Sequence, residues 1–248
     1  MRVVQEAAFV LHATRYRETS LLLEIFSRHH GRIGLVARGA SRPKSGLRAI
    51  LSPFLPLVVN WSGKGELATL SGAETDSSAI GLKGEALFCG LYMNELLVRV
   101  LHRHDPHELL YDCYVAALLR LQGADTVAET LRIFEKHLLQ QLGYGLVLEH
   151  DVVDNLPIAA GVVYDYIPER GPVSASGTEV IGVRVRGATL LALAAERITD
   201  PDLLHESKQL MRVCLAPHLG DRPLHSRKLF RPGRARAGTT HDKVETSD

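Results

Sequence analysis

The sequence predicts an α+β protein in which strands come before helices. Short apolar segments bounded by glycine and proline fill the first 80 of its 248 residues, and apolar residues recur with helical spacing from about residue 81. A run of strands followed by a run of helices is typical of α+β chains. With 46% hydrophobic and 23% charged residues, the chain can bury a core, which excludes wholesale disorder.

The first segment is expected to form a small barrel. Strands are predicted at residues 6–14, 19–28, 32–40, 54–61 and 66–71, with a hairpin-like linker at 62–65 between the last two. Short strands with glycines at the bends are typical of an OB-fold barrel, although an SH3-like barrel would give a similar pattern. We therefore expect an N-terminal OB-fold domain at residues 1–80.

A helical bundle is expected at residues 81–148. Leu87, Leu91 and Val98 follow helical spacing, residues 108–121 form a second predicted helix, and a capping box of Thr126 and Glu129 opens a third that ends at Gly143. Residues 149–233 are predicted to hold short strands at 162–164 and 180–185 around a turn at 168–172, then helices at 188–197 and from Asp200-Pro201 to about 216. Residues 234–248 show no periodicity and are expected to be a disordered tail.

Composition limits the location and chemistry. No apolar run approaches the roughly 20 residues that span a bilayer, and Glu6 interrupts the place of a signal core. Cys89, Cys113 and Cys214 are too far apart for a disulfide framework or a zinc knuckle. A reducing, cytoplasmic location is expected.

The charge distribution indicates a polyanionic partner. The net charge is only +1, but residues 1–80 carry ten basic and six acidic side chains, and residues 222–248 carry seven basic and three acidic ones. Phosphate binding depends on the local field rather than on the total. The predicted DNA-binding residues are Arg32, Arg38, Arg42, Lys44, Arg48, Lys64, Arg227, Lys228 and Arg231. Trp61 is expected either to stack on a base or to pack in the barrel wall.

Signals for an enzyme are weak. The histidine-rich segment His102–His107 could bind a metal, but a solvated helix end explains the same residues. No phosphate-loop frame, G-x-S-x-G motif or catalytic cysteine context is present. We expect a protein without catalytic residues, metal or cofactor; the alternatives are a metal-dependent hydrolase using this segment and a protein adaptor that does not bind DNA.

Seven motifs in order along the chain resemble the bacterial recombination and repair family RecO: Phe9-Val10-Leu11-His12, Glu18-Thr19-Ser20-Leu21, His30-Gly31-Arg32, Val36-Ala37-Arg38-Gly39-Ala40, Leu91-Tyr92-Met93-Asn94-Glu95-Leu96-Leu97, Leu142-Gly143-Tyr144-Gly145 and Pro223-Leu224-His225-Ser226-Arg227-Lys228-Leu229-Phe230. The resemblance implies a non-enzymatic, nucleoid-associated protein that binds single- and double-stranded DNA and anneals complementary strands. It also implies that the protein engages the acidic tail of single-stranded-DNA-binding protein and, with RecR, promotes loading of RecA.

Two expectations follow from this resemblance. The acidic tail needs a cation beside an apolar surface, and Leu131, Arg132 and Leu142 are the predicted binding residues. Many members of the family carry a four-cysteine zinc site after the bundle, but residues 149–177 here contain no cysteine. That stretch is expected to hold together by packing of Val162, Val163, Tyr164 and Tyr166.

Overall fold

The N-terminal part forms a closed barrel of five strands in this computed structural model, which describes residues 2–42, 45–63, 65–123 and 127–226. The strand order is β1-β2-β3-β5-β4, where β4 also pairs with β1 and β3 pairs in parallel with β5. This order is that of an OB-fold, so the predicted barrel is confirmed. The strands are β1 (Arg2–Tyr16), β2 (Ser20–Ser27), β3 (Gly31–Ala37), β4 (Leu57–Ser62) and β5 (Leu67–Thr75).

The long strand β1 closes the barrel because it pairs with two neighbouring strands. Its first half pairs with β4 and its second half with β2, and register irregularities fall between Val3 and Glu6 and between Val10 and His12. Such irregularities increase local twist and bend a strand, which lets one strand turn around a small barrel. A four-residue helix, α1 (Leu47–Ile50), which the sequence pattern did not predict, follows β3.

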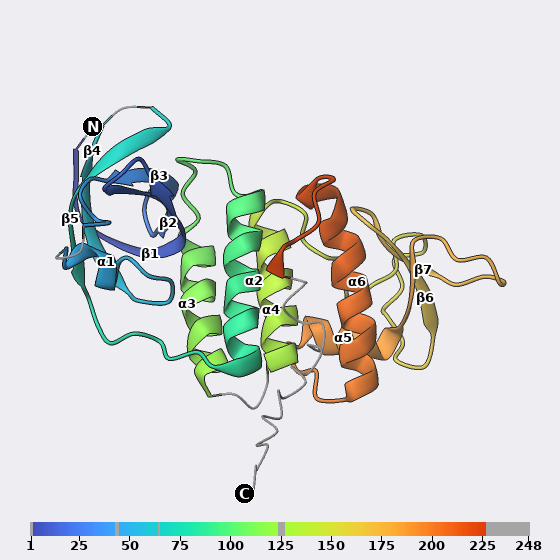
Figure 1. Cartoon of the computed structure of the whole chain (residues 1–248). Helices are drawn as coiled ribbons and strands as arrows, with labels where there is room; N and C mark the ends of the chain where they lie inside the picture. The colour runs from blue at the N-terminus through green and yellow to red at the C-terminus, as the bar shows by residue number, and fades with distance from the viewer. Residues whose placement is uncertain (1, 43–44, 64, 124–126, 227–248) are drawn as a thin grey trace, which may run out of the picture.

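The helices follow the barrel along the molecule (Figure 1). Helices α2 (Gly84–Val100), α3 (Glu108–Gln122) and α4 (Val127–Gln141) occupy the middle of the view, and α5 (Gly187–Ala194) and α6 (Pro201–Leu219) lie beyond them. Asp200 caps α6 by accepting hydrogen bonds from Asp202 N and Leu203 N, as its Asp-Pro start predicts. The helix runs past Pro217, where the sequence predicted its end, because a proline in the last turn removes only one backbone donor.

Two apolar cores form, and the second joins the barrel to the helices. The first fills the barrel interior, including Leu23, Ile33 and Trp61. The second includes Phe9, Leu11 and Phe26 from β1 and β2 together with the facing sides of the helices. The rings of Phe9 and Phe26 lie 5.4 and 6.1 Å from that of Tyr114 on α3. The barrel therefore packs an apolar outer face on the bundle.

The small sheet after the bundle is held by packing and hydrogen bonds. Its order is β7-β6-β8, with β6 (Val163–Ile167), β7 (Gly171–Ser174) and β8 (Val183–Arg186). Tyr164 and Tyr166 are buried as expected, but Val162 and Val163 are exposed, so that part of the packing prediction is wrong. The carboxylate of Asp151 accepts hydrogen bonds from three backbone N–H groups of its own loop, at residues 153, 154 and 156. Strand β7 begins inside the segment predicted as a turn.

Among the helices that the structure describes, none is long and apolar enough to cross a membrane.

Candidate functional site

Two connections meet at one end of the barrel and bring four arginines together there. The β1–β2 turn is tied to the segment after β3, because Ser41 N donates to Thr19 O at 2.9 Å and Ser41 Oγ donates to Ser20 O at 3.2 Å. The strand register extends this proximity, since Leu21 pairs with both Arg15 and Ala37. We call this region the basic barrel end and define it by its exposed arginines, Arg15, Arg17, Arg38 and Arg42.

The charges of the basic barrel end face solvent. In the part of the chain that the structure describes, no ion pair joins any of its four arginines to a carboxylate; Glu18, in the β1–β2 turn, is also exposed. Arg48 is exposed on α1, further along the same connection. Unpaired guanidinium groups gathered on one surface create a field that attracts phosphates.

Arg32 occupies a different environment. Its guanidinium donates to Val98 O on α2 and lies 3.8 Å from the carboxylate of Glu24, which also binds Arg103. Burial lowers the pKa of Arg32, and the charge of Glu24 opposes that shift. Arg32 therefore links the barrel to the helices, apart from the basic barrel end. Spacing along the sequence could not show this, because the link depends on a helix 66 residues further along the chain.

The remaining basic residues predicted to bind DNA are Lys44, Lys64, Arg227, Lys228 and Arg231, and they lie outside the described residues. The described chain ends at Ser226, whose N–H and hydroxyl groups both donate to Glu95 of α2. The C-terminal basic segment thus follows a point anchored on the helical part.

Two aromatic residues of the barrel, Trp61 and Tyr16, have contrasting environments. Trp61 is 3% exposed and its ring packs 5.3 Å from that of His30, so it belongs to the barrel wall and the base-stacking interpretation is wrong. Tyr16 is only partly buried, at the end of β1, and the guanidinium of Arg17 lies 5.2 Å from its ring centre. The sequence analysis did not single out Tyr16, Arg15 or Arg17, although an aromatic between two arginines is visible in the sequence.

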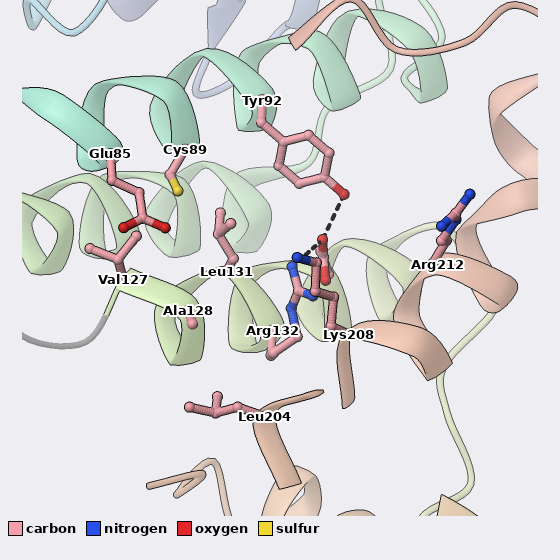
Figure 2. Close-up of a pocket in the computed structure, with 11 residues that line it drawn as sticks. Glu85, Cys89, Tyr92, Val127, Ala128, Leu131, Arg132, Leu204, Lys208 and Arg212 are labelled. Atoms are coloured by element: carbon pink, nitrogen blue, oxygen red, sulfur yellow. Dashed lines mark hydrogen bonds and ion pairs between the residues drawn. The ribbon is translucent and has the colours of Figure 1, made fainter. Parts of the chain in front are cut away.

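A second candidate surface is a pocket of about 300 Å³ between α2, α4 and α6 (Figure 2). Leu131 and Arg132 of α4, both predicted to bind a peptide, line it. Lys208 and Arg212, exposed on α6 and four residues apart, contribute two further cations. Apolar side chains from all three helices and two carboxylates, Glu85 and Glu135, complete the lining. The pocket therefore combines an apolar floor with three cations and two acidic groups.

Arg132 is held in place at the pocket wall. It is 6% exposed, and its guanidinium donates to Glu135 Oε1 at 2.9 Å, which also accepts from the hydroxyl of Tyr92 at 2.6 Å. Its Nε–H has no acceptor among the described residues. A buried donor without a partner is costly.

Leu142 lies away from this pocket. It follows α4 eleven positions after Leu131, a distance of about 16 Å along a helix axis, and is absent from the described residues that line the cavity. It packs instead against the helical core. Leu131 and Leu142 belong to the same stretch of the chain, but three helical turns separate them.

The histidine-rich segment makes structural contacts in the described part of the chain. The described residues contain no group of three or more His, Cys, Asp or Glu side chains arranged to hold a metal ion. In the histidine-rich segment, His104 N donates to Arg32 O of the barrel, and His107 pairs with Asp105 at 3.3 Å. Burial raises the pKa of the Cys89 thiol, in the pocket, to about 12, so this cysteine is not a thiolate near neutral pH.

These features define an α+β protein built from an OB-fold barrel and an attached helical part. A family model described as "Recombination protein O N terminal" matches residues 1–79, and "Recombination protein O C terminal" matches residues 82–228. Proteins named "DNA repair protein RecO" are similar along the chain: that of Nitrosococcus oceani is 46% identical over 99% of both chains, and that of Nitrosospira multiformis is 47% identical over 92% of this chain and 95% of its own. The chain belongs to the RecO family of DNA repair proteins.

Proposed function

We propose that this protein is a non-enzymatic recombination mediator that binds single- and double-stranded DNA through the basic barrel end and anneals complementary strands. The observation that carries the proposal is the exposed cluster of Arg15, Arg17, Arg38 and Arg42, with Arg48 nearby and no carboxylate pairing with them among the described residues. Acting on DNA, the protein would work in the cytoplasm, on the nucleoid.

Annealing follows from charge neutralisation. Two complementary strands repel each other through their phosphates, and a surface that neutralises phosphates lowers this repulsion while releasing counterions. The basic barrel end would do this for one strand, and the predicted residues Lys44, Lys64, Arg227, Lys228 and Arg231 would neutralise further phosphates. No proton transfer or covalent step is needed.

The test is binding of fluorescent oligonucleotides, single-stranded and duplex, across a salt series. The full chain is needed, because removing the barrel would uncover the core that Phe9 and Phe26 share with the helices. Reversing charge at Arg38 and Arg42 should weaken binding to both forms of DNA. It should also reduce the salt slope by about 2, because each arginine neutralises one phosphate.

The control is Arg170→Glu. Arg170 is exposed in the turn between β6 and β7, at the opposite end of the molecule from the barrel (Figure 1). The Arg170→Glu substitution changes the net charge by the same amount per site, but it should leave the affinity for DNA close to that of the wild type. If Arg38→Glu/Arg42→Glu binds and anneals DNA like the wild type, the proposal is wrong.

We further propose that the pocket binds the acidic, aromatic-ended tail of single-stranded-DNA-binding protein. The support is the combination of Leu131 and Arg132 in the pocket lining with the two α6 cations, Lys208 and Arg212. An aromatic side chain would fill the apolar space while the cations hold carboxylates. A protein that carries both a DNA-binding and a tail-binding surface would be directed to DNA gaps coated with single-stranded-DNA-binding protein. There it would act with RecR to promote the loading of RecA.

A peptide titration by calorimetry tests this assignment. Loss of one charge-assisted hydrogen bond of about 1.5 kcal/mol corresponds to roughly a tenfold weaker affinity. Lys208→Ala and Arg132→Ala should each weaken binding of the tail peptide, and Lys208→Ala leaves the buried pair of Arg132 and Glu135 intact. Leu142 lies outside the pocket, so Leu142→Ala should leave the peptide affinity unchanged if the pocket is the binding site. Unchanged affinity in both the Arg132→Ala and the Lys208→Ala variants would show that the assignment is wrong.

A further inference from the structure

Tyr16 has an unusual position among the large aromatic residues of the barrel. Within the described barrel, Phe9, Phe26, Phe54 and Trp61 are all buried, whereas Tyr16 is only partly buried. It is the last residue of β1 and pairs with Ser20 across the turn, which places it inside the basic barrel end.

The turn holds the ring beside a cation. Arg17 has a φ of 54°, in the left-handed region that non-glycine residues rarely adopt, and its guanidinium lies 5.2 Å from the centre of the Tyr16 ring. A cation over an aromatic face is attracted by the ring electrons. The tie from Ser41 to Thr19 fixes this turn against the segment that carries Arg38 and Arg42.

We propose that Tyr16 and Arg17 form a stacking platform for an unpaired base, while Arg15, Arg38 and Arg42 hold the phosphates on either side of it. The inference rests on the proposed DNA binding by the basic barrel end. It adds to that proposal a preference for single-stranded over double-stranded DNA. An aromatic ring stacks on any base, so the platform is tolerant of sequence. In a duplex both faces of each base are already covered by its neighbours, so the platform favours single strands.

The experiment measures the affinities of the full chain for a fluorescein-labelled 20-nucleotide single strand and for the matching duplex. Base–aromatic stacking is worth about 1–3 kcal/mol per base, so Tyr16→Ala should weaken single-strand binding about 5- to 150-fold. Duplex affinity should change less than twofold, and the salt slope should stay the same, because every phosphate-binding arginine is still present. Tyr16→Phe keeps the ring and should bind the single strand like the wild type.

A fluorescent base supplies a second readout. The emission of 2-aminopurine is quenched when the base stacks, so a single strand carrying it should lose emission on binding to the wild type and to Tyr16→Phe, and less on binding to Tyr16→Ala. Circular dichroism and thermal unfolding establish that each variant is folded.

The outcomes separate this inference from the function on which it rests. If Arg38→Glu/Arg42→Glu weakens binding but Tyr16→Ala matches the wild type, or weakens both forms of DNA equally, the platform is wrong and the binding surface stands. If the arginine variant leaves both affinities unchanged, the proposed function of the barrel end fails as well.

Discussion

Asn94 joins three elements through hydrogen bonds that are sealed from water. Its Nδ2 donates to Leu11 O of β1 at 3.1 Å, and its Oδ1 accepts from the hydroxyl of Tyr114 on α3 at 2.6 Å. Asn94 is 2% exposed and Tyr114 is fully buried. Burial raises the pKa of Tyr114 above its ordinary value, so the phenol stays a neutral donor.

Replacing Asn94 with leucine should therefore destabilise the protein. The change removes both of these buried hydrogen bonds, at a cost of about 2–4 kcal/mol in the free energy of unfolding. Urea denaturation measures this loss. Tyr114→Phe removes only the second hydrogen bond and should cost less; a loss under about 0.5 kcal/mol for Asn94→Leu would contradict this account.

Glu95 makes the docking of the chain at residues 225–226 dependent on pH. Burial acts to raise the pKa of Glu95, but hydrogen bonds from Ser226 and His225, with the charge of Arg99, outweigh it and hold the pKa below the ordinary value of 4.5. A depressed carboxyl pKa adds stability above the ordinary pKa, and this stability is lost as the pH falls through the folded value.

We expect the Ser226 N–H to lose protection from hydrogen exchange, after correction for the intrinsic rate, as the pH falls below about 4.5. Glu95→Gln cannot ionise, so its Ser226 N–H should be less protected at pH 7 and show little further change with acid. Identical pH profiles for the two proteins would show that the carboxylate does not anchor this segment.

At the scale of elements, the β2–β3 turn and the histidine-rich connection between α2 and α3 are packed together. Gly31 has a φ of 67°, and a Cβ atom there would lie 1.8 Å from Asp105 O. The neighbouring hydrogen bond from His104 N to Arg32 O, at 3.0 Å, continues the same junction. The segment that suggested a metal site is thus a connection laid against the barrel.

Gly31→Ala tests this junction. Both the left-handed conformation and the collision with backbone should lower the free energy of unfolding by more than about 3 kcal/mol. Gly46→Ala is the matched control, because Gly46 has a right-handed helical conformation and no heavy atom within 4 Å of the added carbon. Its stability should be unchanged or slightly raised, and thermal denaturation compares the two; equal midpoints would refute the close approach.

At the scale of the whole molecule, the shared core should make the barrel and the helices unfold together. Family models divide the chain near residue 80, but Phe9, Leu11 and Phe26 belong to the same core as the helices. Exposing that face costs free energy in proportion to the apolar area, so the barrel loses stability once the bundle unfolds.

The single tryptophan, Trp61, reports on the barrel and circular dichroism reports on the helices. The two unfolding curves in urea should superimpose. Phe26→Ala, which removes a fully buried ring between the two parts, should shift both curves together by about 3–5 kcal/mol. A Trp61 transition separated from the helical one would show two independent units.

Much of the architecture was predictable, because the local pattern and the final packing agree. Short apolar segments bounded by glycine and proline located the barrel strands, helical spacing located the bundle helices, and Asp200-Pro201 located the start of α6. Strand β7 was missed because its Gly-Pro sequence is typical of turns, and α1 because four residues show no periodicity. Both form where neighbouring segments supply the packing that local sequence lacks.

The sequence alone determined the class of fold, the family and the basic character of the barrel, because these depend on composition, order and local spacing. Only the tertiary structure decided which charges share a surface. It directed Arg32 toward α2, buried Trp61, left Leu142 outside the pocket, and gathered Arg15, Arg17, Arg38 and Arg42 beside Tyr16. The physical reason is that a closed barrel makes neighbours of residues distant in sequence, and burial or pairing then decides which side chains remain available to a ligand.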